Sequence, residues 1–472
     1  MIIFKRERNK TFVKIKIMKA FLRPFLNLGS SYFIVSFLPL SAVITTGEFT
    51  LLIFSVFIFG LFYPLLVRYL NFGFFLQGLL TLLTIFSIFI LGKDLGWFIL
   101  IVLFLVGIFF AKFFKFERPR FFLAIFIFLF LFGSLLSAQD VTDLTGQEPP
   151  NENYNHDSYI FLKTAYLMKE GNPYYKAFDQ AVLNDVRAEG SPSDLFQYRT
   201  PTLILFLSLL PNPGFSAWII FLILSSVLII ASYQIAQKFA PNPFSLIAPY
   251  LLIPYLLFAS KSHWFLIMEW WSMFFIILFL AFFLHKKTTI AFVFISLSFF
   301  VRELAVIPIV ANLLLSILFK NKKYLLFFLG VFLVSLIFYL IHIYFVSANG
   351  IDIFSSSPKR LLGGGFLFLR TTLAFATQNY FSINWGFQNM AFYFLVTLFG
   401  GFFAILANKK ERLLILISYL TFLSFPFVFL FVSASRFNDY WGIVYVPIMI
   451  SLLPWSLSSL NICLRKFTSK FP

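Results

Sequence analysis

The sequence predicts an all-α fold: a polytopic integral membrane helical bundle of about 13–15 transmembrane helices, with a large outer loop carrying short interfacial helices. Hydrophobic residues make up 60% of the chain and charged residues 12%, too few to cover a water-soluble globule. Apolar runs of about 16–23 residues recur, the length that crosses roughly 30 Å of hydrocarbon as a helix. Strand-like alternation does not appear, and helices satisfy their own backbone hydrogen bonds in lipid.

Basic clusters separate the apolar runs and set the order of the expected helices. The first 23 residues hold eight Lys or Arg, and no cleavable signal sequence follows them, so they predict a cytoplasmic tail. From this tail the runs alternate between the two membrane faces. The expected transmembrane segments are 31–46, 49–67, 72–91, 95–111, 121–138, 215–236, 244–258, 264–284, 288–301, 304–319, 324–346, 387–407, 413–432 and 440–458.

The charge distribution predicts sidedness. With the basic clusters inside, the cytoplasmic face carries 25 basic and three acidic residues, and the outer face 12 basic and 16 acidic residues. We therefore expect a multi-pass protein of the cell (plasma) membrane with both termini cytoplasmic. The net charge of +18 then reflects topology and not a nucleic acid partner. The run 201–211 is too short to span, and an even count of 14 crossings requires it to dip into the membrane and return.

These segments predict five regions. Residues 1–30 form a cytoplasmic basic tail and residues 31–120 an N-terminal four-helix transmembrane module. Residues 121–346 form a transmembrane core that includes the outer loop 139–200. Residues 347–386 form a second outer loop, and residues 387–472 hold the C-terminal transmembrane helices and a basic tail. The lone Cys463 excludes an intramolecular disulfide.

The outer loop 139–200 concentrates the carboxylates, with ten of the 19 acidic residues of the chain. Asp157 opens an apolar pattern that fits a short helix along the membrane surface, and the breakers from Gly171 to Pro173 stop it. An Asp at a helix start is either a cap or a group that does chemistry.

Further ionisable groups fall at helix ends on the same predicted face: Lys261, His263, Glu269, Arg302, Glu303, His342 and Arg436. Unpaired ions in hydrocarbon are costly and usually mark a site. Glu269 is expected two turns below the outer end of its helix, and Arg436 at the start of the last helix. The alternatives are that Arg302 and Glu303 neutralise each other or extend to the interface, and that His342 bonds a backbone carbonyl.

A metal site is only weakly indicated. His156 and Asp157 together leave a divalent metal open, but no three-ligand pattern with metal spacing appears. The sequence therefore defines no cofactor and leaves a divalent metal open.

Several motifs resemble a known family. The loop resembles the first outer loop of the type C (GT-C) polytopic glycosyltransferases, and is most similar to the polyprenyl-phosphate-mannose-dependent mannosyltransferase branch. The matching residues are Asp157-x-Tyr159, Ala165, Gly171-Asn172-Pro173-Tyr174-Tyr175 and Phe196-x-Tyr198-x-x-Pro201. The junction from Phe300 to Glu303 also resembles bacterial members of that superfamily.

The resemblance implies a transferase that takes a sugar from a polyprenyl-phosphate donor at the outer membrane face. Asp157 matches the family's general base toward the acceptor hydroxyl. The acceptor would be a glycan, lipid or protein, and membrane lipids would surround the chain. The residues expected to bind substrate are His156, Tyr159, Tyr198, Arg199, Lys261, His263, Glu269, Arg302, Glu303, His342 and Arg436.

Two other functions stay open. A transporter or flippase for lipid-linked sugars would show broken helices, midplane polar residues and repeat symmetry. An O-antigen ligase or polymerase would depend on Lys359, Arg360 and Arg370 of the second outer loop, with Asp157 dispensable.

Overall fold

The computed structural model describes residues 119–136, 138, 157–183, 198–241, 244–260, 263–349, 365–375, 383–431 and 436–469, without the side chains of 383–389, 392, 436–439 and 464–469. The chain divides into two compact units, Met1–Phe116 and Glu117–Pro472, and every described residue belongs to the second. The four helices expected between residues 31 and 111 lie outside the described residues, as do residues 139–156 and 184–197 of the expected outer loop 139–200.

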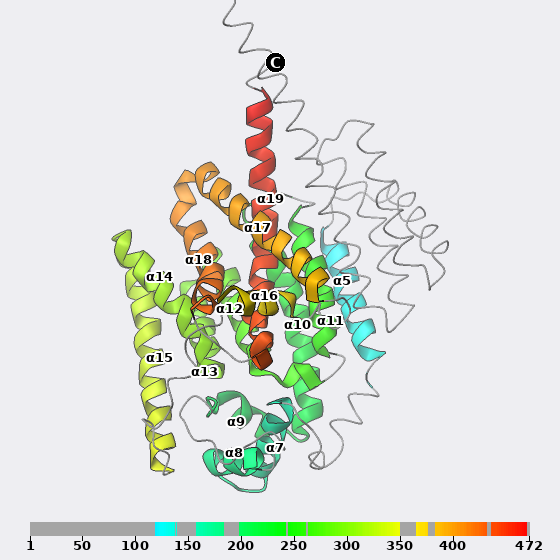
Figure 1. Ribbon diagram of the computed structural model, residues 1–472, viewed down its shortest axis with the longest axis vertical. Coiled ribbons are helices and arrows are strands. Elements are labelled where there is room, and N and C mark those ends of the chain that lie inside the picture. Colours follow the sequence, from blue (N-terminus) through cyan, green and yellow to red (C-terminus); the bar gives the residue numbers. More distant parts are fainter. Residues whose placement is uncertain are drawn as a thin grey trace, which may run out of the picture. The chain divides into compact units, whose positions relative to one another are not determined.

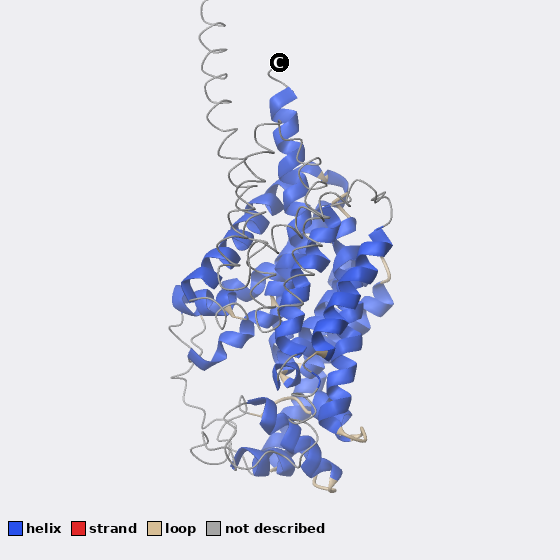
Figure 2. Cartoon of the chain, turned by 90° about the vertical axis from the view of Figure 1, so that its right-hand side faces the viewer, coloured by secondary structure: helices blue, strands red, loops and turns tan. Residues whose placement is uncertain are grey.

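The described residues contain helices and no strand (Figures 1 and 2). In chain order the elements are α5 (Pro119–Leu135), α7 (Asp157–Lys169), α8 (Tyr174–Leu183), α9 (Thr202–Ser208), α10 (Pro213–Gln237), η1 (Phe244–Leu246), α11 (Ile247–Ser260), η2 (His263–Leu266), α12 (Met268–Leu284), α13 (Thr288–Val301), η3 (Glu303–Ala305), α14 (Val306–Leu318), α15 (Lys322–Ala348), α16 (Gly365–Ala374), α17 (Ile383–Ala407), η5 (Lys409–Glu411), α18 (Arg412–Phe429), η6 (Arg436–Val444) and α19 (Val446–Ser469).

Four helices in the described part of the chain are long and apolar enough to cross a membrane. They cover Pro213–Gln237, Lys322–Ala348, Lys409–Phe429 and Val446–Cys463. The predicted helical membrane fold is confirmed at this level. α15 illustrates the lipid-facing character, because its exposed side chains include Leu326, Ile337 and Tyr344, which water would solvate poorly. These apolar helices indicate a protein embedded in a membrane.

The bundle is built around α11 and α12, whose side chains are almost all buried. α10 packs against both, α5 and α19 cover α11, and α13 covers α12. The three helices α7, α8 and α9, here called the α7–α9 layer, lie together at the end of this unit opposite the C-terminus of α19 (Figures 1 and 2). The layer therefore meets one end of the bundle.

The expected helix 264–284 is interrupted, and this prediction was wrong. Residues 263–266 form η2, Ile267 is extended (φ −69°, ψ 129°), and α12 begins at Met268. The indole of Trp271 donates a hydrogen bond to the Phe265 carbonyl (3.0 Å), an acceptor near the break. Glu269 consequently lies in the first turn of α12 and not two turns inside a helix.

One further expected helix boundary needs correction. The last helix does not start at 440, because η6 comes first and α19 begins at Val446. The stretch 347–386 contains α16 and the start of α17. α8 follows the Gly171 turn, where the sequence pattern predicted only a stop. The run 201–211 contains the seven-residue helix α9, which packs on α7 and α10.

The α17–α19 crossing has no room for a side chain at Gly400, and we expect Gly400→Ala to lower the unfolding free energy by about 1–3 kcal/mol. A Cβ at Gly400 would lie 2.3 Å from Ser456 Cβ. Gly330→Ala is the control, since its Cβ would meet only the Phe292 ring at 3.2 Å, and that ring can shift. Thermal unfolding in detergent checks this, and equal midpoints for the two variants would contradict the close crossing.

Candidate active site

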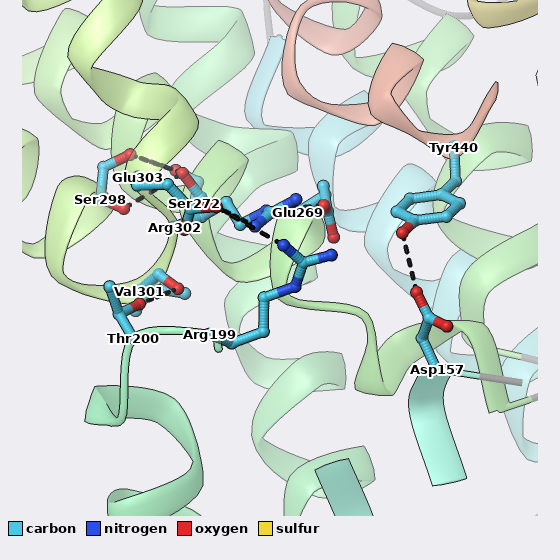
Figure 3. Close-up of polar contacts among 10 residues, drawn as sticks. All are labelled: Asp157, Arg199, Thr200, Glu269, Ser272, Ser298, Val301, Arg302, Glu303 and Tyr440. Atoms are coloured by element: carbon cyan, nitrogen blue, oxygen red, sulfur yellow. Dashed lines mark hydrogen bonds and ion pairs between the residues drawn. The ribbon is translucent and has the colours of Figure 1, made fainter. Parts of the chain in front are cut away.

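Asp157 is the first residue of α7 and faces the bundle (Figure 3). Its Oδ2 accepts a hydrogen bond from the hydroxyl of Tyr440 in η6 at 2.8 Å. Burial first, and then the Asp157 and Glu269 carboxylates, raise the pKa of Tyr440 well above its ordinary value, against the opposing effect of Arg199 and Arg302. Tyr440 therefore stays protonated and acts as a donor to the carboxylate.

Four charged residues form what we call the charge cluster: Arg199, Glu269, Arg302 and Glu303 (Figure 3). Arg302 is only 1% exposed, and its Nε donates to Glu269 Oε1 at 2.7 Å. Arg302 also forms an ion pair with Glu303 through Nη1. The alternative in which Arg302 and Glu303 neutralise each other is thus the observed arrangement, extended by Glu269. A buried guanidinium needs such partners because an unpaired ion there is costly.

The backbone around Arg302 explains how this side chain is held. Arg302 ends α13 in an extended conformation (φ −149°, ψ 117°), and its amide donates to the Ser298 carbonyl at 2.9 Å. The Ser272 and Ser298 hydroxyls lie 2.8 Å apart and each also donates to the carbonyl of the other residue. Ser272 lies one turn from Glu269, so these hydrogen bonds fix α12 and α13 at the level of the buried ion pair.

Arg199 comes from the segment that directly precedes α9 in the chain. Its Nη1 lies 3.6 Å from Glu303 Oε1, and its side chain is 18% exposed. The segment is held on both sides, because Tyr174 donates to the Arg199 carbonyl (2.6 Å) and Thr200 donates to the Val301 carbonyl (2.8 Å). Arg199 is therefore the more accessible of the two arginines in the charge cluster.

His342 lies six residues before the end of α15, and its contacts are within the protein. Its Nδ1 is 2.9 Å from the Tyr175 hydroxyl, and it also bonds the backbone of Tyr198. Burial raises the pKa of Tyr175 to about 12, so this phenol is protonated at neutral pH and can donate. The Tyr198 hydroxyl in turn donates to Asp179. These groups fasten the layer to α15, which matches the backbone-bonded alternative for His342.

His263 and Tyr159 meet beside the layer, with ring centroids 5.2 Å apart. Tyr159 is buried and His263 is half-buried. Of the remaining predicted site residues, His156 and Lys261 lie outside the described residues. Arg436 begins η6, but its side chain is not among those described.

Metal-binding groups do not gather within the part of the chain that the structure describes. No set of three or more His, Cys, Asp or Glu side chains there lies close enough to hold a metal ion. The metal site that the sequence left open involves His156, which lies outside the described residues.

Sequence reasoning missed Tyr440 and Trp441. The Arg302 guanidinium carbon lies 5.9 Å from the centre of the Trp441 ring, within the range of a cation–π contact. Tyr440 touches Asp157 across 283 positions of sequence. In the sequence these two residues are marked only by their position next to the polar residues before the last apolar run. That position does not show that Tyr440 contacts Asp157 or that Trp441 contacts Arg302.

The chain was compared with known proteins on the basis of sequence and fold. No protein-family model, curated protein or solved structure matches it. The family resemblance of the outer loop consequently stays a prediction, and the site is interpreted from its own residues.

Proposed function

We propose that the chain is a membrane glycosyltransferase that moves a sugar from a polyprenyl-phosphate donor to an acceptor hydroxyl. One observation carries this proposal. The Asp157 carboxylate accepts a hydrogen bond from Tyr440, and Tyr440 lies within electrostatic reach of Arg199, Glu269 and Arg302 of the charge cluster. A carboxylate can act as a base toward a hydroxyl, and a guanidinium can hold a phosphate. A carboxylate and guanidinium groups that lie near one end of the helical bundle support this proposal.

In the proposed reaction Asp157 takes the proton of the acceptor hydroxyl as the acceptor oxygen attacks the anomeric carbon. A new carbon–oxygen bond forms there, and the bond between that carbon and the phosphate oxygen breaks. The electron pair leaves with the polyprenyl phosphate, and the configuration at the anomeric carbon inverts. A cation near the leaving oxygen stabilises the charge that accumulates in the transition state.

We assign the phosphate contact to Arg199 and a positioning role to Arg302. Arg302 is buried and already engages two carboxylates, so a phosphate would have to displace one of them. Arg199 has a longer ion pair to Glu303 and a more exposed side chain. A planar guanidinium also matches a phosphate with two parallel hydrogen bonds.

The topology that we propose with this function follows the charge pattern. It has about 13–15 transmembrane helices, both termini in the cytoplasm, and the α7–α9 layer with Asp157 on the non-cytoplasmic face. The loop motifs favour a mannosyltransferase-like enzyme of the cell envelope. A hexose on a polyprenyl phosphate is then the donor, and a glycan, lipid or protein hydroxyl the acceptor.

Purified protein in lipid nanodiscs, given polyprenyl-phosphate mannose and a mixed acceptor fraction, is expected to release polyprenyl phosphate. Arg199→Gln is expected to weaken donor binding roughly ten- to hundredfold, because a hydrogen-bonded charge pair contributes about 1.5–3 kcal/mol. Arg199→Lys keeps the charge but lacks the planar guanidinium. Its affinity for the donor should lie between those of the wild type and Arg199→Gln. The apparent KM for donor is the measurement.

Lys238→Gln is the matched control, since it also removes a partly exposed cation paired with a glutamate, here Glu411 at 3.8 Å. It should leave the KM for donor unchanged. An Arg199→Gln enzyme with wild-type KM would remove Arg199 from the phosphate site. Movement of intact lipid-linked sugar across the bilayer without release of lipid phosphate would instead favour the flippase alternative.

A further inference from the structure

The Tyr440 hydroxyl is placed for a task that the reaction described above leaves unassigned. Tyr440 is 6% exposed, and its hydroxyl reaches Asp157 Oδ2 at 2.8 Å (Figure 3). A neutral phenol that donates to a carboxylate favours the ionised form and restricts its rotation. The contact joins two elements, η6 and α7, that are otherwise far apart in the sequence.

We propose that Tyr440 is the positioning residue of Asp157, holding that carboxylate ionised and oriented toward the acceptor hydroxyl. This inference rests on the proposed transferase function and extends it to a residue outside the loop motifs. Tyr440 itself neither bonds the sugar nor exchanges its proton in the reaction. Asp157 is the base, and the phenol keeps its hydrogen.

The neighbours of Tyr440 hold it in place. Trp441 lies under the Arg302 guanidinium, at 5.9 Å from the carbon to the ring centre. A Cβ at Gly442 would lie 1.9 Å from the Thr372 carbonyl oxygen, so the backbone of η6 is pressed directly against α16. η6 also packs against α12, which carries Glu269. The Tyr440 hydroxyl is consequently held by α12, the same helix that carries Glu269 of the charge cluster.

The protonation of Tyr440 agrees with this role. Burial and the nearby Asp157 and Glu269 carboxylates raise the pKa of Tyr440 well above its ordinary value. The nearby carboxylates of Asp157 and Glu269 raise the pKa of the phenol, and the guanidinium groups of Arg199 and Arg302 lower it. The phenol therefore stays a donor across the pH range in which a carboxylate titrates.

Tyr440→Phe removes the hydroxyl and keeps the ring. We expect roughly a tenfold fall in kcat with the KM for donor unchanged, because the base loses a charge-assisted hydrogen bond. Loss of a donor to the ionised form raises the pKa of the carboxylate, so the acidic limb of the pH–rate profile moves up by about one pH unit. A merely structural defect would lower activity without moving that limb.

Tyr445→Phe is the matched control. It also removes a buried tyrosine hydroxyl five residues along, one that lies 2.9 Å from Thr372 Oγ1 and does not touch Asp157. It should leave the pH profile in place. Equal behaviour of the two variants would overturn the positioning role.

A titration that needs no turnover separates this inference from the proposed function. In protein labelled with carboxyl-¹³C aspartate, the signal lost in Asp157→Asn assigns Asp157 among the nine aspartates of the chain. Its midpoint should rise in Tyr440→Phe and stay unchanged in Tyr445→Phe, and an unmoved midpoint in Tyr440→Phe would refute the coupling. If the wild-type protein releases no lipid phosphate, the transferase proposal fails, and the titration still decides whether Tyr440 sets the state of Asp157.

Discussion

Asp157→Asn is expected to lower the release of polyprenyl phosphate by about 10²–10⁴-fold, since the acceptor hydroxyl loses its general base. Asparagine keeps the shape of aspartate and still accepts the hydrogen bond from Tyr440, so the fold should persist. The initial rate at saturating donor is the measurement. Donor binding should stay near the wild-type value, because the base does not contact the phosphate.

Asp179→Asn tests whether the effect is specific to Asp157. Asp179 lies in the same layer and also accepts a tyrosine hydroxyl, that of Tyr198. We expect at most a few-fold change in rate for this variant. Comparable losses in both variants would attribute the effect to the layer's stability, and full activity of Asp157→Asn would eliminate the proposed base.

Arg302→Met is expected to lower the unfolding free energy by about 3–5 kcal/mol, the typical effect of breaking a buried ion pair. The variant leaves the Glu269 carboxylate buried without its guanidinium partner. Arg302→Met combined with Glu269→Gln removes both charges and should recover most of the loss. Glu303 keeps Arg199 as an ion-pair partner in the double variant.

Unfolding by a denaturing detergent from mixed micelles measures this effect. Lys238→Met is the control, because the Lys238–Glu411 pair is partly exposed and such pairs contribute about 0–1 kcal/mol. A stable Arg302→Met single variant would contradict the burial of the charge cluster. A double variant no more stable than the single one would show that packing, and not the unpaired carboxylate, causes the loss.

Local periodicity predicted the helices that stand between clear breakers. The expected segment 288–301 has the bounds of α13, and the helix opening at Asp157 ends before Gly171, which adopts φ +97°. The break at Ile267 has no Gly or Pro to announce it, and the Trp271 indole bond to Phe265 depends on tertiary folding. Hydrophobic periodicity therefore predicted how far a helix extends better than it predicted where a helix is interrupted.

The site was predictable as a set of residue types but not as a set of contacts. An ion pair between Arg302 and Glu303 was one of the alternatives that the sequence left open, and Glu303 is one of the two observed partners of Arg302. Glu269 comes from another helix, and Tyr440 from a segment near the end of the chain. Helical spacing tells which face a residue occupies, but packing decides which face lies opposite.

The separation of 283 positions between Asp157 and Tyr440 has a consequence for biosynthesis. A growing chain that has emerged only as far as α18 holds the carboxylate but neither its phenol partner nor the Trp441 ring beneath Arg302. These contacts can form only after the ribosome has synthesised η6. An unfinished polypeptide thus carries the Asp157 carboxylate without the Tyr440 and Trp441 contacts on which the proposed reaction depends.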